Sequence, residues 1–258
     1  MKHIYKFSIV LLTVFTFIGC NVDDDDSVTV LPMKELTASL SQQVDVIRIA
    51  DDATSYDLVI NFSEALPSYS TIEYSLDGGA TTTSSASSGD NTLVIPIAFD
   101  EDKFYRDVVL SDFIVVNAAA RRFSTSITGN SSLRIARQGT IFAAPGSVEI
   151  TVTWSDSSKD LDIFLIEGNQ DLGGALLDDS QGTTTTEQVV LSADEEGVFS
   201  LFMYEWNFDY PVDYEINYVF EDGQVLSFDS NITIDSFQFT MSKSNDGAQM
   251  ICYINKIE

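Results

Sequence analysis

The sequence predicts an all-β protein built from two tandem antiparallel β-sandwich domains. Apolar and polar residues alternate over short segments, as at residues 148–154, and this period indicates half-buried strands. Turn pairs such as Asp222-Gly223 separate these segments, as expected for hairpins. No long stretch places apolar residues at helical spacing. Strands and tight turns are therefore the expected elements throughout.

In the first half, residues 27–40 are interpreted as a linker, and residues 44–49 hold the first apolar run. The stretch at residues 80–91, rich in Thr, Ser and Gly, predicts a flexible loop. Gly129-Asn130 predicts a hairpin between its flanking strands. Pro96 cannot donate a hydrogen bond to a neighbouring strand, so its strand is expected at an edge or a bulge. Strands are expected at 56–62, 71–76, 92–99, 113–116, 123–128 and 132–136, and a strand or short helix at 108–110.

A domain boundary is predicted at residues 138–146, which combine Gly and Pro with small side chains. The second half reads as about eight short strands, the number that a jelly roll or a sandwich needs. Hairpins are expected at Asp222-Gly223 and at residues 245–247. The strands are expected at 148–154, 161–165, 189–191, 198–204, 212–220, 225–228, 237–241 and 250–254.

The N-terminus has the features of an export signal. Residues 1–6 are basic and residues 7–18 are apolar, as in secretory signals. This run is shorter than the roughly 20 apolar residues of a spanning helix. It ends in Phe17-Ile18-Gly19-Cys20, which resembles the lipobox of bacterial lipoproteins. The resemblance implies cleavage before Cys20 and lipidation of Cys20; the alternative is an ordinary signal peptide with an incidental cysteine.

Four aspartates at residues 23–26 follow Cys20 directly. They resemble the acidic tag that sends lipoproteins of one large Gram-negative phylum to the outer face of the outer membrane. The alternative is a solvated, self-repelling tether. We therefore expect a lipoprotein signal peptide at 1–19 and a lipidated acidic tether at 20–40. A first sandwich at 41–138 and a second at 139–258 follow, on a protein that its lipid holds at the outer membrane, facing outward.

Composition excludes several functions. The formal net charge of -27 argues against nucleic acid, whose phosphates need Lys and Arg as partners. The single histidine, His3, leaves with the signal, so the mature chain has no Ser-His-Asp triad and no imidazole metal ligand. Cys252 lies in an apolar run and is interpreted as a small buried hydrophobe. We expect no enzyme activity; the alternative is a glycoside hydrolase that uses two carboxylates.

Residues 152–156, followed by 159–165, resemble the opening of bacterial pre-peptidase C-terminal domains. These are jelly rolls attached to secreted enzymes or cell-surface proteins, and the resemblance implies that calcium is a possible ligand. The first half, with residues 56–63 leading into the strand of Tyr74, resembles an immunoglobulin-like or Calx-beta-like sandwich. That second likeness carries no site.

Five aspartates form the candidate calcium site. Asp160 and Asp162 lie two apart on an expected strand, so both carboxylates point to one face. Asp156 from the preceding loop converges with them on a hard cation, which takes 6–8 oxygen ligands. Asp178 and Asp179 add ligands if their loop folds over. The alternative is that all five are surface acids at a strand edge.

The candidate ligand surface is the run of aromatics at Tyr204, Trp206, Phe208 and Tyr210, which acids and an amide interrupt. On a loop these rings stack on sugars while the polar groups bind hydroxyls. The alternative is a strand end whose rings close the core. The function expected is a non-catalytic binding or adhesion module for a glycan or a surface protein. The alternative is a structural or accessory subunit of an outer-membrane surface complex.

Overall fold

The computed structural model describes residues 33–116 and 122–257, and every regular element in them is a strand. The prediction of an all-β fold is confirmed. Cys20, the signal and the acidic tag lie outside the described residues. Across the described part of the chain, no helix has the length and apolar character needed to cross a membrane.

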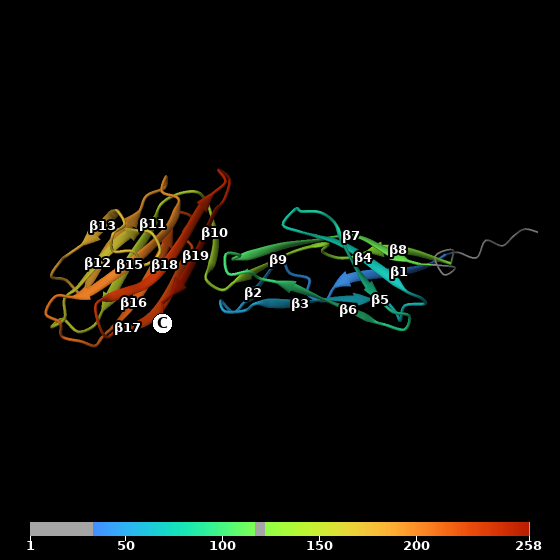
Figure 1. Ribbon diagram of the computed structural model, residues 1–258, viewed down its shortest axis with the longest axis horizontal. Helices are drawn as coiled ribbons and strands as arrows, with labels where there is room; N and C mark the ends of the chain where they lie inside the picture. Colours follow the sequence, from blue (N-terminus) through green and yellow to red (C-terminus); the bar gives the residue numbers. More distant parts are fainter. Residues whose placement is uncertain (1–32, 117–121, 258) are drawn as a thin grey trace, which may run out of the picture.

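Nineteen strands fall into two lobes that follow each other along the chain (Figure 1). The first lobe holds β1 (Lys34–Leu40), β2 (Val46–Ile49), β3 (Ser55–Phe62), β4 (Ser70–Leu76), β5 (Thr82–Ala86), β6 (Thr92–Ala98), β7 (Tyr105–Val115), β8 (Phe123–Ile127) and β9 (Ser132–Arg137). The second holds β10 (Thr140–Ala143), β11 (Val148–Trp154), β12 (Leu161–Glu167), β13 (Leu176–Ser180), β14 (Thr186–Leu191), β15 (Gly197–Glu205), β16 (Val212–Phe220), β17 (Val225–Ile232), β18 (Ser236–Asn245) and β19 (Met250–Lys256).

In the first lobe, the sheet β6-β3-β1-β8 faces the sheet β2-β9-β7-β4-β5. Alternate residues of both sheets enclose one apolar core, in which Leu36, Ile60, Ile72 and Phe113 are fully buried. Most strand pairs are antiparallel, but β1 pairs with β8 and β2 with β9 in parallel. Strand β6, which contains Pro96, lies at the edge of its sheet, as predicted from the missing N–H.

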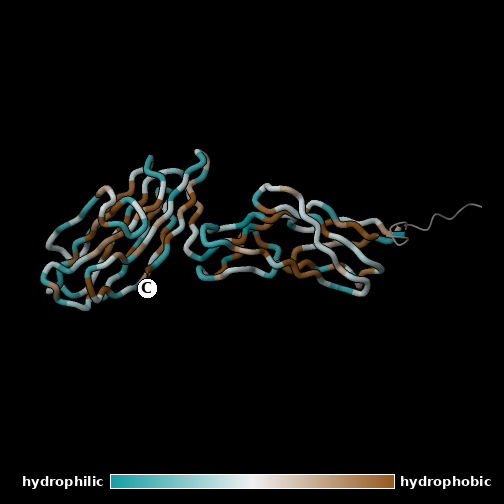
Figure 2. The backbone as a smooth tube through the Cα atoms, viewed as in Figure 1, coloured by the Kyte–Doolittle hydropathy of each residue, from teal (hydrophilic) through white to brown (hydrophobic). Residues whose placement is uncertain are grey.

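In the second lobe, the six-stranded sheet β10-β19-β18-β15-β12-β13 faces the four-stranded sheet β14-β11-β16-β17. A separate core fills the space between them, with Trp154, Phe199, Tyr218 and Phe239 among its large buried side chains. Figure 2 shows the apolar residues along the strands of both lobes and the hydrophilic residues at the turns. The two cores share no residue, so each lobe is a sandwich in its own right.

Two segments that we predicted to lack strands contain one each. The linker prediction is wrong for Lys34–Leu40, which is β1: Leu36, Ala38 and Leu40 alternate into the core. The flexible-loop prediction is wrong for Thr82–Ala86, which is β5 and pairs with β4. Backbone pairing to a neighbouring strand here outweighs the weak strand preference of Ser and Ala.

The hairpin predicted at Gly129-Asn130 is also wrong. Strand β8 pairs with β1 in one sheet, whereas β9 pairs with β7 and β2 in the other, so this turn crosses between sheets. The segments at 108–110 and 113–116 are parts of one strand, β7, which has an irregular register against β4. The hairpin at Asp222-Gly223 is confirmed, because β16 and β17 pair directly across it.

The two sandwiches meet where β9 ends at Arg137 and β10 begins at Thr140. The Arg48 guanidinium donates to the carbonyl oxygens of Arg137 and Thr140, and Gly139 N donates to the Asp51 carboxylate at 3.0 Å. A Cβ on Gly139 would lie 2.1 Å from the carbonyl oxygen of Ile254, so only glycine fits there. The short connection is therefore bonded to both lobes.

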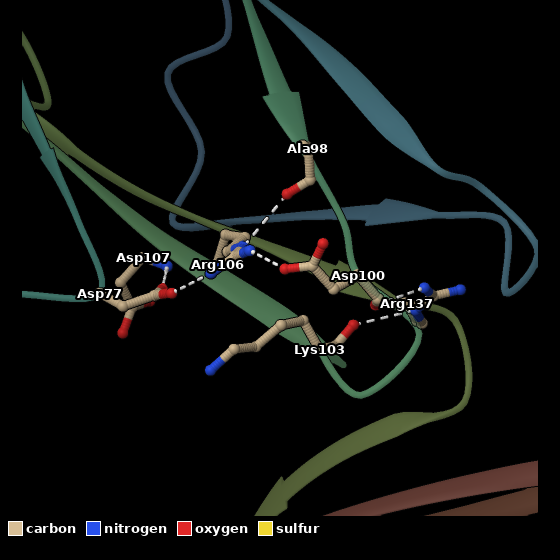
Figure 3. Close-up of polar contacts among 7 residues, drawn as sticks. All are labelled: Asp77, Ala98, Asp100, Lys103, Arg106, Asp107 and Arg137. Atoms are coloured by element: carbon tan, nitrogen blue, oxygen red, sulfur yellow. Dashed lines mark hydrogen bonds and ion pairs between the residues drawn. The ribbon is translucent and has the colours of Figure 1, made fainter.

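Polar contacts hold the first sandwich's end of this junction in place (Figure 3). Arg106 donates to the carboxylates of Asp77 at 2.7 Å and Asp100 at 3.1 Å, and to the Ala98 carbonyl oxygen. Arg137 donates to the carbonyl oxygens of Asp100 and Lys103. These bonds fix the turn between β6 and β7, which presents Phe104 to the second sandwich. There the Phe104 ring stacks on Tyr253 with centroids 4.2 Å apart.

Candidate functional site

The aromatic loop, residues 206–211, connects β15 to β16 in the second sandwich. Two of its rings point into solvent: Trp206 is 59% exposed and Phe208 is 70% exposed. Phe208 also has φ of 55°, a left-handed conformation that bulky residues adopt rarely. Two large exposed aromatics on one loop are uncommon in a domain with a complete core, so they indicate a binding surface.

Buried polar groups hold the aromatic loop in place from below. The Glu205 carboxylate is fully buried and accepts hydrogen bonds from the backbone N–H groups of Asp209 at 2.6 Å and Asp160 at 3.2 Å. Trp206 N in turn donates to the Asp160 carbonyl oxygen at 2.8 Å. Lys159 forms an ion pair with the Asp209 carboxylate at 2.6 Å. The loop is thus tied to the segment that precedes β12, and its exposed rings are preorganised.

Tyr210 belongs to this internal support. Its hydroxyl accepts a hydrogen bond from Glu205 N at 2.9 Å and donates one to the Asp235 carboxylate. Its ring packs against the core of the sandwich. Of the four predicted ligand residues, Trp206 and Phe208 therefore face solvent, and Tyr210 braces the loop. Tyr204 lies on strand β15 with its ring on the outer face of the six-stranded sheet, half-buried.

Tyr204 belongs to a series of neighbouring rings on strands β12, β15 and β18. Its ring stacks on Phe164 of β12 with centroids 5.7 Å apart, and lies 6.2 Å from Trp206. Phe164 in turn lies 6.4 Å from Phe202 of β15, and Phe202 lies 5.3 Å from Phe237 of β18. Sequence reasoning missed Phe164, Phe202 and Phe237. A signal was available, because Phe202 and Phe164 occupy the outward positions of strands whose other alternate residues are apolar and buried.

The structure separates the five aspartates of the candidate calcium site. Asp156 is exposed and caps its own turn, where it accepts hydrogen bonds from the Ser158 hydroxyl and N–H that lower its pKa. Asp178 lies on β13, not on a loop, and accepts a bond from Val190 N at 2.7 Å. Asp160, Asp162 and Asp179 share the outer face near Tyr204: Asp162 lies opposite Tyr204, and Asp179 lies opposite Phe164.

Asp162 has the least ordinary environment of these acids. It is 3% exposed, and burial raises its pKa above the usual value; the charges of Asp160, Glu187 and Asp179 raise it further, while a hydrogen bond from Tyr204 opposes the shift. The pKa of Tyr204 is raised to about 12 by burial and by this bond to Asp162. Uncompensated negative charge therefore collects on this part of the face.

Asp160 Oδ1 is buried and has no hydrogen-bond partner.

Glu187, which sequence reasoning did not single out, is a buried acid on β14, on the same inward face as Val189 and Leu191. It accepts bonds from the Ser180 hydroxyl and Gly182 N. Nevertheless, over the described ranges no group of three or more His, Cys, Asp or Glu side chains is placed to hold a metal ion.

Comparisons with known proteins identify no family for the chain. No protein-family model matches it, and a search of curated proteins finds no match. Many solved structures do match. One is the apo-form Calx CBD1 domain, at 10% identity and a TM-score of 0.29, over 40% of this chain and 97% of that one. CBD12 from CALX1.2 aligns at 12% identity and a TM-score of 0.31, over 72% and 83% of the two chains.

A third match is a tetra-tandem repeat in the extending region of a large adhesion protein. It aligns at 11% identity and a TM-score of 0.23, over 86% of this chain and 63% of that one. At such TM-scores these likenesses transfer no ligand and no role. The β-sandwich architecture follows from the strand pairing of the chain itself, and the function has to be argued from its own surface.

Proposed function

We propose that the chain is a non-catalytic binding module whose ligand is a glycan and whose ligand surface is the aromatic loop of the second sandwich. The observation that carries this proposal is the exposure of Trp206 and Phe208 on a loop that Glu205, Lys159 and Tyr210 hold rigid. A rigid loop loses little conformational entropy on binding, so the contact area of the rings contributes to affinity.

The groups between the rings favour a glycan. Sugars combine apolar ring faces with hydroxyls, and Trp and Tyr combine an apolar surface with a polar tip. Asn207 and Asp209 are exposed beside Trp206 and Phe208. The Asn207 amide can donate hydrogen bonds to sugar hydroxyls and accept them, and the Asp209 carboxylate can accept them. The net charge of -27 disfavours anionic ligands at the same surface.

The proposal includes the anchor. In this proposal, a lipid on Cys20 holds the module at the outer membrane, and the four aspartates at residues 23–26 favour an outward-facing position. Several acyl chains hold a protein at a membrane stably where one chain is marginal. Mass spectrometry of the native protein tests this part: we expect a chain that begins at an acylated Cys20, and a bare cysteine or a retained leader would contradict it.

A glycan array tests the ligand. Trp206→Ala and Phe208→Ala should each weaken binding by about 2 kcal/mol, roughly 30-fold, as aromatic hot spots do. Tyr69→Ala is the matched control, because Tyr69 is also an exposed aromatic (47%) but belongs to the first sandwich. Binding that survives both loop substitutions, or no binding to any glycan, overturns the proposal.

Calcium is a second, separable part of the proposal, with Asp160 and Asp162 as its protein ligands. The partnerless Asp160 Oδ1 and the mutual repulsion of these acids support it. Because the described residues provide no complete metal cluster, water would supply the remaining oxygens that calcium needs. A ligand of the folded state raises stability, so calcium should raise the melting temperature and a chelator should reverse it. A melting temperature indifferent to both removes calcium from the proposal.

The bonded junction favours a second candidate, a structural or accessory subunit of a surface complex. Arg48, Gly139 and the Phe104–Tyr253 stack fix the two sandwiches end to end, which suits a spacer. Purification of the lipidated protein from native membranes distinguishes the two candidates. One stoichiometric partner that is retained by both Trp206→Ala and Phe208→Ala favours the accessory role.

A further inference from the structure

The aromatic loop is one end of a longer row of rings. We call this row the aromatic track and define it as Phe237, Phe202, Phe164, Tyr204 and Trp206. Successive ring centroids lie 5.3, 6.4, 5.7 and 6.2 Å apart. The first four rings are half-buried and Trp206 is exposed. Strands β12, β15 and β18, which carry the track, are neighbours in the second sandwich (Figure 1).

Strand register aligns the rings on the outer face of the sheet. Phe202 and Tyr204 are two residues apart on β15, so they point to the same face. Phe164 lies directly opposite Phe202 on one side, and Phe237 lies opposite it on the other. The outer face of a two-layer sandwich faces solvent and normally carries polar residues. Aromatics at these positions are not needed for the core, which lies on the other face.

A pocket of about 550 Å³ lies at the Phe237 end of the track. Phe202 and Phe237 line it together with Leu172, Ile234, Asp235 and Gln238. Leu172 and Ile234 are each 66% exposed. The track thus runs from an exposed ring on a rigid loop, over three strands, to a partly apolar pocket. It is too long for one terminal sugar.

We propose that the aromatic track binds an extended, uncharged polysaccharide chain, with the chain running from Trp206 to the pocket at Phe237. This inference rests on the proposed glycan-binding function and specifies its substrate class. Each ring packs against the apolar face of one sugar, and every sugar added along the track contributes its own contact. Affinity therefore grows with chain length until the track is filled.

The polar groups along the track favour a polysaccharide over a protein partner. Asp179, which is exposed, lies opposite Phe164, and the half-buried Asp235 lies in the wall of the pocket. The centre of a protein–protein interface is depleted of charged residues, because burying a carboxylate without a partner is costly. Sugar hydroxyls donate hydrogen bonds to carboxylates and satisfy them. The same acids repel sulfated sugars, uronates and anionic lipids, while the nearby Lys159 is already paired with Asp209.

Calorimetry on the full chain tests the inference with cello-, laminari-, manno- and malto-oligosaccharides of two and six sugar units. For at least one series we expect the six-unit sugar to bind about tenfold more tightly than the two-unit sugar. Phe237→Leu keeps an apolar side chain but removes the ring, so it should abolish this gain with chain length. Trp206→Ala should weaken both lengths. Tyr69→Leu, an aromatic-to-Leu change on the first sandwich, should alter neither.

The outcomes separate this inference from the function on which it rests. Equal affinity for two and six units, or a length gain that Phe237→Leu retains, overturns the track while the glycan-binding loop stands. Tighter binding to polygalacturonate or heparin than to every uncharged sugar overturns the charge argument and the track with it. Binding to none of these sugars contradicts the proposed function itself. Melting curves of Phe237→Leu and Trp206→Ala show whether each variant is folded before it is titrated.

Discussion

The two sandwiches have similar interiors but different surfaces. Each encloses one apolar core between two sheets, with Phe113 in the first and Phe199 in the second about equally buried. On the first sandwich, charged pairs such as Arg106–Asp77 and Arg134–Asp107 occupy the junction side. On the second, Phe164, Phe202 and Tyr204 occupy outward strand positions.

This difference shows which residues carry the fold and which carry function. Inward residues of either sandwich satisfy the same requirement, removal of apolar surface from water. Outward residues are not needed to fill the core, so their residue types indicate the function of the surface. The first sandwich uses its surface for ion pairs and the junction. The second carries rings on its outer face that a solvated sheet does not need, and substitutions in both sandwiches test this division.

The largest effect is expected from Phe113→Ala, which removes a buried ring and should cost about 3–5 kcal/mol. Both tryptophans, Trp154 and Trp206, lie in the second sandwich, so their fluorescence reports on that sandwich alone. In urea, Phe113→Ala should lower the midpoint at which the first sandwich unfolds, measured by circular dichroism. It should leave the midpoint of the fluorescence transition unchanged. Phe199→Ala should do the reverse. Equal shifts in both signals for either variant would show one cooperative unit and break the comparison.

An intermediate effect is expected from Glu205→Gln in the second sandwich. Both oxygens of the buried carboxylate accept a hydrogen bond from a backbone N–H. Glutamine has only one side-chain oxygen, and its NH2 group cannot accept the second bond. Hydrogen bonds to a charged group contribute about 1.5–3 kcal/mol, so the fluorescence unfolding midpoint should fall accordingly. Glu215→Gln, at an exposed position of β16, is the control and should stay within about 0.5 kcal/mol of the parent. A midpoint for Glu205→Gln equal to that of the control contradicts the bracing role.

Asp162→Asn should have a smaller effect whose sign depends on pH. The folded pKa of Asp162 is raised, so the folded state holds this proton more tightly than the unfolded state does. The stability of the parent should therefore fall as pH rises from the ordinary pKa of 3.8 through the raised value. Asparagine does not titrate, so the variant should lose this slope and match or exceed the parent at neutral pH. Unfolding midpoints of both proteins from pH 3 to 7 measure this, and parallel curves would contradict it.

The smallest effect is expected from Lys34→Ala on the first sandwich. Lys34 forms an exposed ion pair with Glu64, and exposed pairs contribute about 0–1 kcal/mol. The circular-dichroism midpoint should change little, and adding salt should reduce even that difference. A loss comparable to that of Glu205→Gln would show that surface charge stabilises the first sandwich more than the comparison allows.

Part of the candidate site was predictable from residue type and spacing. Trp206 and Phe208 follow a strand and alternate with polar residues, which is enough to suggest a loop that exposes rings. The bracing role of Tyr210 was not predictable, because its partner Asp235 lies 25 residues further along the chain. The positions of Asp178 and Asp179 were not predictable either. They lie on β13, and no local sequence pattern indicates that this strand pairs with β12.

By itself, the sequence determined the all-β class and the inward face of most strands. Both depend on the period-two alternation of apolar residues, which is a local property of the chain. Only the tertiary structure decided which strands pair and that the Gly129-Asn130 turn crosses between sheets. It also decided that Phe237, Phe202, Phe164 and Tyr204 form a series of neighbouring rings. These facts depend on backbone hydrogen bonds between segments far apart in the chain, and the free energy of such pairing comes from whole sheets packing together.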